Sequence, residues 1–426
     1  MEDLTDVYND LIMEHSMNSY NKKKLENADY SEIGHNPNCG DEITLELKLN
    51  GDKIEDMAFS GHGCAISQAS TSIMIDTLRG KTIEEAKEII KTFIEMIKRE
   101  TTDEEELKKL EDAIAFRNVS NMPARVKCAL LAWHTIEDML NKNDNTELQD
   151  AYGNKIVVPA GFKIVEGATT VDKGIVIEDV TETATKGSQF VWIPVGTITK
   201  ADGTSVEINL NRYTFDESGN STAQGENVIE TYYQELETSN KGNTVAKSIP
   251  NFKESVETNC GYYIGRYEAR TTTERNSKDD ELTQITEKGI NPVYNWVTQL
   301  QAASQAQSMY NSNKFTSDLI NSYAWDTAIT FIQRFTEQTN YANQNSLNIG
   351  SIAQTGTKND KQCNIYDMAS NIWEWTTETS IFSELPCVLR GGSYDYDGNY
   401  TSLRYGAKTV DNRHYGGFRP ILYVNV

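Results

Sequence analysis

Cysteine, basic residues and long apolar stretches are all scarce in this sequence of 426 residues. Six cysteines are too few for a scaffold held together by disulfides. No apolar run is long enough to span a membrane, and the acidic start MEDLTDVYND lacks the basic and apolar parts of a secretory signal. The 40 Lys and Arg against 63 Asp and Glu give a net charge of −23, which argues against non-specific nucleic-acid binding. We therefore expect a cytoplasmic protein without nucleic-acid or membrane partners.

The length exceeds that of one ordinary core, and the composition changes near residue 143. Lys, Glu, Leu and Ile are frequent before this point, whereas Thr, Asn, Ser, Gly and Tyr dominate after it. The polar seam NKNDNTELQDAYGNK is typical of a linker. The sequence thus predicts a first domain over 1–143, a linker over 144–156 and a second domain over 157–426.

The first domain should begin with a small antiparallel sheet. ITLELKL alternates apolar and polar residues, Asn50-Gly51 is a strong hairpin signal, and KIEDMAFS returns as a second strand. With Asn50-Gly51 as the two-residue turn, Asp41 would lie opposite Ser60. The residues just before the first strand would then meet those just after the second.

Helices should follow this sheet, which makes the first domain α+β. Possible capping boxes at Thr82–Glu85 and Thr102–Glu105 indicate two helix starts, and Pro123 suits the first turn of a last helix. The first of these helices has one apolar face, formed by Ile83, Ala86, Ile90, Phe93, Ile94 and Ile97.

Three cysteines and a carboxylate meet in this arrangement. The hairpin brings Cys39 and Asp41 beside Cys64, which opens the helix CAISQASTSIMIDTL. Cys128 falls in the first turns of the last helix, and helix N-termini favour thiolate over thiol. Such a set suits tetrahedral zinc or iron–sulfur chemistry, although single free cysteines are more often small buried hydrophobic residues. His62 fits a turn residue better than a fifth ligand.

The segments NPNCGD (36–41), GHGCAISQAS (61–70) and ARVKCALLAW (124–133) resemble the three cysteine motifs of the U-type iron–sulfur scaffold family, SufU branch. The resemblance implies zinc bound by Cys39, Asp41, Cys64 and Cys128. It also implies sulfur acceptance at Cys39 from a SufS-like cysteine desulfurase, with Arg125 as a helper near the metal or the partner. Any enzymatic activity would be at most that of a zinc-dependent sulfurtransferase, and a nascent iron–sulfur cluster could occupy the same ligands.

The second domain is expected to be a loop-rich α+β domain with helices near QLQAASQAQSMY and AWDTAITFIQRF. Its most specific segments resemble the formylglycine-generating-enzyme, or sulfatase-modifying-factor, family, which has a C-type-lectin-like fold. These segments are VVPAGF (157–162), QFVWIPVG (189–196), GYYIGRYEA (261–269), DMASNIWEWTTE (367–378), VLRGGSY (388–394) and GGFRPILY (416–423).

One departure from that family affects activity. Tyr400 and Tyr405 stand where the family's enzymes have two cysteines, so we expect a binding module without copper-dependent oxidase activity. Asp367, Ser370, Ile372 and Glu374 resemble a calcium site of the family, with capping of local backbone as the alternative. The ligand face would include Tyr394, Tyr396, Asn399 and Tyr400.

Two hypotheses therefore stand. The first is a sulfur-accepting iron–sulfur assembly protein with a non-catalytic lectin-like extension. The alternative is a ligand-binding or display protein whose second domain, with an unknown ligand, carries the function.

Overall fold

The structure is a computed structural model, and its chain forms two compact units, Met1–Asn143 and Asp144–Val426. The residues described are 4–37, 39–142, 144–167, 169–181, 183–225, 232–235, 245–271, 273–282, 292–310, 312–345, 350–357, 360–395, 398 and 400–426.

The first unit contains an antiparallel sheet in the order β1-β2-β3. Its strands are β1 (Tyr30–Asn36), β2 (Asp41–Asn50) and β3 (Lys53–His62). The two strands expected from the alternating pattern are confirmed, whereas β1 was not predicted.

The predicted register of the hairpin is wrong. Asn50 pairs with Lys53, so the turn is formed by Gly51 and Asp52, and Gly51 has a φ of 64° that suits glycine. A bulge then adds one residue to β3, because Lys48 pairs with Asp56 and Leu49 with Ile54. As a result Ser60 faces Thr44, and Asp41 lies farther along the hairpin, beyond the pair formed by Glu42 and His62.

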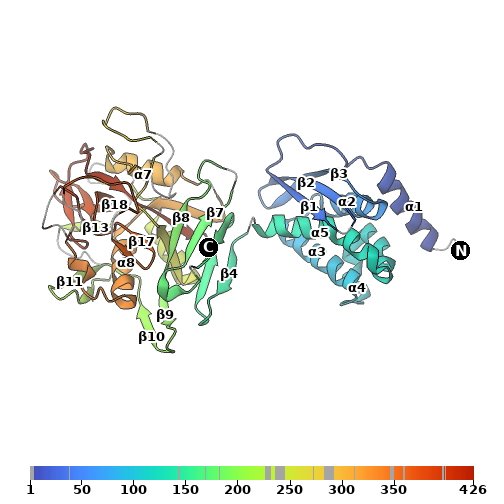
Figure 1. Cartoon of the computed structure of the whole chain (residues 1–426), viewed down its shortest axis with the longest axis horizontal. Helices are drawn as coiled ribbons and strands as arrows, with labels where there is room; N and C mark the ends of the chain where they lie inside the picture. Colours follow the sequence, from blue (N-terminus) through green and yellow to red (C-terminus); the bar gives the residue numbers. More distant parts are fainter. Residues whose placement is uncertain are drawn as a thin grey trace. The chain divides into compact units, whose positions relative to one another are not determined.

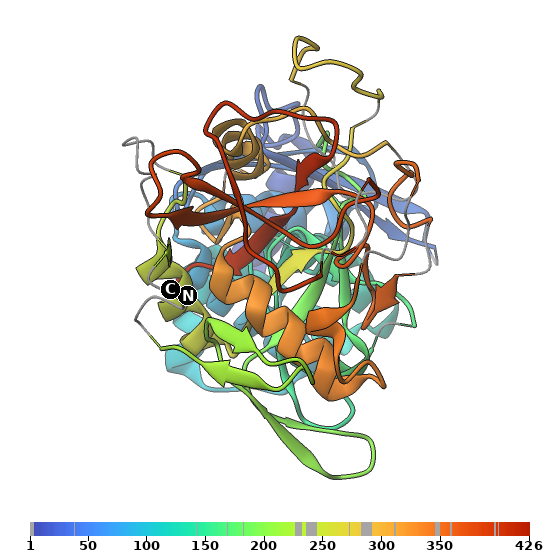
Figure 2. The same cartoon turned by 90° about the vertical axis from the view of Figure 1, so that its left-hand side faces the viewer.

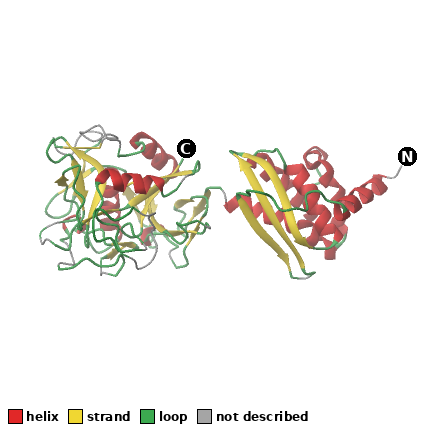
Figure 3. Cartoon of the chain, turned by 90° about the horizontal axis from the view of Figure 1, so that it is seen from above, coloured by secondary structure: helices red, strands yellow, loops and turns green. Residues whose placement is uncertain are grey.

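Helices cover one face of this sheet (Figure 3). The helical segments are α1 (Leu4–Met17), α2 (Ala65–Leu78), α3 (Ile83–Lys98), α4 (Glu104–Leu107), a 3-10 segment (Lys108–Asn121) and α5 (Pro123–Lys142). The capping box at Thr82 and Glu85 is confirmed at the start of α3. The second one is wrong, because Asp103 caps α4 by accepting from the amide of Glu105.

The core of the first unit lies between the sheet and these helices. All six residues of the predicted apolar face of α3 belong to it. Phe93 of α3 stacks on Trp133 of α5 with ring centroids 3.9 Å apart, and the Trp133 indole donates to Ser70 of α2. Apolar packing and buried hydrogen bonds of Ser70 therefore fix α2, α3 and α5 against one another.

The second unit is rich in strands, with helices between them (Figure 1). Among the described residues, the larger sheet runs β15 (Phe315–Leu319), β22 (Pro420–Val424), β14 (Gly261–Gly265), β8 (Gln189–Pro194), β7 (Val176–Asp179) and β6 (Phe162–Ile164). The smaller sheet runs β13 (Tyr233–Glu235), β18 (Trp373–Ser380), β19 (Cys387–Arg390) and β20 (Tyr405–Ala407), with β21 (Gly416–Phe418) parallel to β18.

Short strand pairs and helices complete the second unit. The pairs are β4 (Thr146–Gln149) with β5 (Lys155–Val158), β9 (Gly196–Thr199) with β10 (Ser205–Ile208), β11 (Tyr213–Phe215) with β12 (Ser221–Ala223), and β16 (Lys361–Gln362) with β17 (Ile365–Tyr366). The helices are α6 (Ile249–Asn259), α7 (Gln299–Ser308) and α8 (Ser322–Phe335), together with the 3-10 turns Val171–Lys173 and Tyr341–Asn343. Helix α8, orange in Figure 2, contacts both sheets through β8 and β18.

The stretch 144–156, expected to be a linker, is part of a β-hairpin in the structure. It contains β4 and the start of β5, which pair with each other, and it clusters with the second unit. The polar composition that indicated a linker is that of an exposed hairpin, since every residue of β4 is exposed. Among the described residues, no helix is both long and apolar enough to cross a membrane.

Candidate metal centre

Three segments of the first unit converge at one end of its sheet. Cys39 lies in the turn between β1 and β2, and Asp41 is the first residue of β2. Cys64 occupies the N-cap position of α2, two residues after the end of β3. Cys128 lies in the second turn of α5. The sequence therefore places these side chains together through a turn, a hairpin and two helix starts.

Three of the four side chains lie close together. Ligand atoms of Cys39, Asp41 and Cys128 all lie within 4.8 Å of one another, and the two sulfur atoms are 3.7 Å apart. Cys39 is exposed, whereas Asp41 and Cys128 are buried. The Asn36 side-chain amide donates to the sulfur of Cys128 at 4.0 Å. A buried pair of ligands with one accessible sulfur suits a site that holds a metal and also meets a partner.

The two oxygens of Asp41 have different surroundings. Oδ1 accepts a hydrogen bond of 2.9 Å from the backbone amide of Cys64. Oδ2 is buried and accepts no N–H or O–H hydrogen bond from the described residues. One oxygen is thus held by the start of α2, and the other remains available as a ligand atom.

The site changes the pKa of both its buried acids. Burial would raise the pKa of Asp41, but the facing thiol of Cys39 and the amide of Cys64 outweigh it and hold that pKa below its usual value. Burial and the neighbouring groups Cys39, Cys64 and Asp41 raise the pKa of Cys128 well above its usual range. The expectation that a helix start would make Cys128 a thiolate is therefore wrong for the metal-free site, because burial and the neighbouring groups favour the thiol.

The other predicted residues lie at or near this end of the unit. Cys64 is half-buried and falls outside the tight group of three, although it contributes to the raised pKa of Cys128. Arg125 is exposed on α5, nearly one turn before Cys128. His62 is exposed at the end of β3 and is not in the group.

Sequence reasoning missed Asn36, Gly63 and Ser67 at this site. A Cβ added at Gly63 would lie 3.3 Å from Cγ of Asp41 and 3.1 Å from Oγ of Ser67, so glycine allows the loop to pass close to the carboxylate. All three residues lie within the cysteine motifs, and their closeness in sequence to the cysteines was the one feature that could have indicated a place at this site.

A helix-covered sheet with two thiols and a carboxylate at its end defines a metal-binding or sulfur-handling domain. The family described as NifU-like N terminal domain matches residues 7–129. The zinc-dependent sulfurtransferase SufU of Bacillus subtilis is 40% identical over 141 residues, which are 33% of this chain and 94% of that protein. The iron–sulfur cluster assembly scaffold protein IscU of Thermotoga maritima is 38% identical over 136 residues, 32% of this chain and 94% of that protein. Through its first unit, the chain belongs to the family of NifU-like scaffold domains.

A solved structure is similar over the same region. It is that of a candidate iron–sulfur cluster assembly scaffold protein for the SUF system from Fervidobacterium islandicum, with 44% identity and a TM-score of 0.30. The match covers 32% of this chain and 99% of that one.

The second unit gives no support to the predicted calcium site. The residues expected to form it are Asp367, Ser370, Ile372 and Glu374. Both carboxylate oxygens of Glu374 accept from Arg419, at 2.6 and 3.0 Å, and the amide of Ile372 donates to Glu268. Burial raises the pKa of Asp367 to about 7, so a large share of this carboxyl group carries a proton at neutral pH. These contacts give Glu374 a structural role in the described part of the unit.

A second set of buried charges lies beneath the smaller sheet. Glu378 accepts from Arg212 at 2.7 Å, Arg390 at 3.1 Å and Arg404 at 2.6 Å. Asp326 also binds Arg390 and Arg404. Every one of these side chains is at least nine-tenths buried, and the carboxylates and guanidinium groups offset one another's charge.

The proposed ligand face of the second unit is described in part. Tyr396 and Asn399 lie outside the described residues. The rings of Trp296 and Tyr394 lie 5.6 and 6.0 Å from that of His414. Tyr405 stacks on Trp373 and is 47% exposed.

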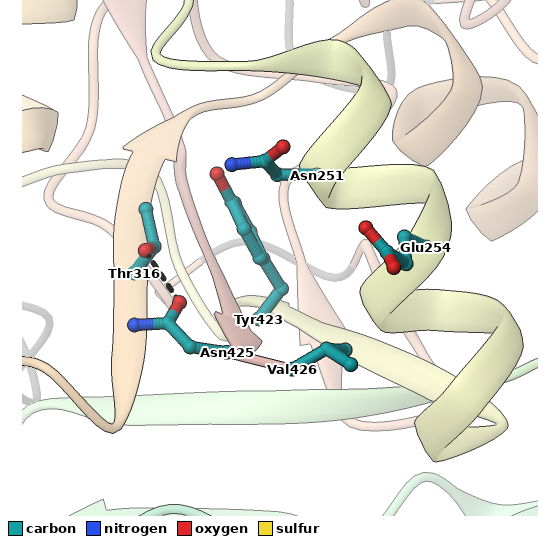
Figure 4. A pocket seen from close by; sticks show the side chains of 6 residues that line it. All are labelled: Asn251, Glu254, Thr316, Tyr423, Asn425 and Val426. Carbon is teal, nitrogen blue, oxygen red and sulfur yellow. Dashed lines mark hydrogen bonds between the residues drawn. The ribbon is translucent and has the colours of Figure 1, made fainter.

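A small polar pocket lies elsewhere in this unit (Figure 4). Its lining residues are Asn251, Glu254, Thr316, Tyr423, Asn425 and Val426. The Thr316 hydroxyl donates to Asn425 across it at 2.7 Å. Glu254 is the one charged side chain among the six lining residues, and it is exposed. The pocket therefore lacks the converging charged groups of a reactive site.

Proposed function

We propose that the first unit accepts sulfur from a cysteine desulfurase during iron–sulfur cluster assembly and holds zinc while it does so. The observation that carries this proposal is the group of Cys39, Asp41 and Cys128, whose ligand atoms lie within 4.8 Å of one another. Similarity to a relative named as a zinc-dependent sulfurtransferase supports the choice of metal and of chemistry.

The donor set fits zinc. Cys39, Asp41 and Cys128 would hold the ion, and Cys64 at the N-cap of α2 would complete four ligands. Bound zinc keeps its cysteine ligands deprotonated, and this offsets the burial that raises the pKa of Cys128. The unpartnered Oδ2 of Asp41 gains a partner in the same way.

Cys39 is the sulfur acceptor in this proposal because it is the exposed thiol of the cluster. Its thiolate attacks the terminal sulfur of a persulfide on the desulfurase and forms a new S–S bond. The S–S bond of the partner breaks, and the partner leaves as a thiolate, so electrons and sulfur atoms balance without an added oxidant. Arg125, exposed on α5, supplies positive charge for the approaching partner.

The experiment uses the purified full chain, a cysteine desulfurase and cysteine. We expect about one zinc per chain, and a mass gain of one sulfur atom on Cys39 that requires the desulfurase. Cys39→Ser should abolish the gain, and Cys128→Ser should release zinc, while Cys260→Ser in the second unit is the matched control. Wild-type protein without zinc, or sulfur on another cysteine, would refute the proposal. An iron–sulfur chromophore after addition of iron would assign the same ligands to a scaffold instead.

For the second unit we propose a non-catalytic binding role, based on its sequence resemblance to the formylglycine-generating-enzyme family and on the lectin-like fold that this resemblance implies. Support comes from Tyr400 and Tyr405 at the family's cysteine positions, and from the aromatic group around His414. Screening the full chain against immobilised glycans and proteins, with Tyr394→Ala as the variant, tests this alternative function. Copper binding with oxygen consumption would contradict the non-catalytic role.

A further inference from the structure

Ser67 is buried beside the metal centre without a hydrogen-bond partner. Its side chain is fully buried in the first turn of α2, and its hydroxyl has no partner among the described residues. Other buried serines of this helix are satisfied, since Ser70 donates to the carbonyl of Ala129 and accepts from Trp133. An unpaired buried hydroxyl costs stability, so Ser67 differs from its neighbours in a way that suggests a partner it meets only in the loaded site.

The carboxylate of Asp41, which has an unpaired oxygen, lies on the same side of Gly63 as this hydroxyl. Oγ of Ser67 and Cγ of Asp41 lie 3.1 and 3.3 Å from the same point, the place where a Cβ on Gly63 would stand. Oδ2 of Asp41 is unpaired as well. Because Gly63 has no side chain, none separates the hydroxyl from the carboxylate at that point.

We propose that Ser67 is a positioning residue for the metal centre, whose hydroxyl donates to the Asp41 carboxylate and fixes it as an oxygen ligand. Carboxylates that bind metals are themselves held by hydrogen bonds, and loss of such a bond weakens metal binding. The amide of Cys64 already holds Oδ1. A second donor stops the carboxylate from rotating about its own axis, and because each carboxylate oxygen has two lone pairs, Oδ2 can accept from Ser67 and still bind the ion. This inference rests on the proposed function, because it requires that the site binds zinc.

The test measures zinc affinity of the full chain by competition with a chromophoric chelator. Ser67→Ala should weaken binding by about 10- to 100-fold, whereas Ser67→Thr, which keeps the hydroxyl, should restore most of it. Thermal unfolding of the metal-free protein should be unchanged or slightly improved in Ser67→Ala, because the hydroxyl has no partner there. Ser70→Ala is the matched control. It should destabilise the metal-free fold and leave zinc affinity intact.

A double-mutant cycle with Asp41→Ala shows whether Ser67 acts through Asp41. In that background Ser67→Ala should have no further effect on affinity. Cobalt(II) in place of zinc gives a second readout, because its visible absorption should shift in Ser67→Ala towards that of Asp41→Ala. Wild-type affinity in Ser67→Ala, or an equal loss in the Asp41→Ala background, would overturn the inference. Wild-type protein that binds no zinc at all would instead refute the proposed function, and this inference would fall with it.

Discussion

Replacing Glu378 by glutamine should strongly destabilise the second unit. Glutamine keeps the shape of the side chain but removes the charge on which Arg212, Arg390 and Arg404 converge. Removing one partner of a buried ion pair costs about 3–5 kcal/mol, because a charge is left buried without compensation. Asp326 still binds two of the three guanidinium groups, so we expect the lower end, about 3 kcal/mol.

The expected acid dependence of Glu378 points to a similar magnitude. Burial would raise the pKa of Glu378, but Arg404, Arg390 and Arg212 outweigh it and lower the pKa from 4.5 to about 2. At about 1.4 kcal/mol per pKa unit this difference corresponds to roughly 3 kcal/mol. Since the folded pKa is below the unfolded one, this stabilisation is complete above pH 4.5 and is lost as the pH falls towards 2.

The assay is denaturant unfolding of the full chain followed by tryptophan fluorescence, at neutral pH and through the acid range. Trp325 lies 5.7 Å from the Arg390 guanidinium, so its emission reports on this cluster. Glu337→Gln, at an exposed position after α8, is the matched control. A loss below about 1 kcal/mol in Glu378→Gln, or an acid profile identical to that of the wild type, would refute the reasoning.

Two further predictions concern the second unit. Burial raises the pKa of Asp318 from 3.8 to about 6, against the opposing hydrogen bonds from Lys247 and Gln307. Ionisation of Asp318 should therefore reduce the free energy of unfolding by about 3 kcal/mol as the pH rises from about 4 to about 6. Denaturant unfolding at several pH values should show a smaller pH dependence of this free energy in Asp318→Asn than in the wild type. An equal pH dependence would contradict the prediction. Because Glu374 is bonded to Arg419, calcium added to chelator-treated protein should leave Tm unchanged, and a saturable rise in Tm would restore the calcium site.

The sequence contained the local signals of the first unit but not its register. The helical spacing of apolar residues and the capping box predicted α3 correctly, because both signals depend only on residues close together in the sequence. The turn could not be assigned from Asn50-Gly51 alone, since the bulge near Leu49 depends on how the two strands twist against each other. The wrong register did not change the prediction that Asp41 and Cys64 lie side by side. In the observed register Asp41 lies nearer the start of α2, where the amide of Cys64 donates to it.

The contacts of the second unit were beyond local reasoning. The sequence shows Glu378 close to Trp373 and Trp375, but it does not show that Arg212 and Arg404, from other segments of the chain, bind it. The predicted calcium ligands failed for the same reason. Arg419, which binds Glu374, follows it by 45 residues and becomes its neighbour only when β21 pairs with β18.

The two units show how a buried carboxylate in a site differs from one that supports a fold. Glu378 forms ion pairs with three guanidinium groups, so its charge is already compensated and it has little affinity left for a metal cation. Asp367 keeps one unpaired oxygen, but burial raises its pKa to about 7, so a large share of its carboxyl group carries a proton at neutral pH. Asp41 has one bonded and one unpaired oxygen, and its pKa is lowered, so the charge persists without a cation beside it. A charge that persists next to two thiols suits a metal ion, and this difference is why we propose the metal site in the first unit and not in the second.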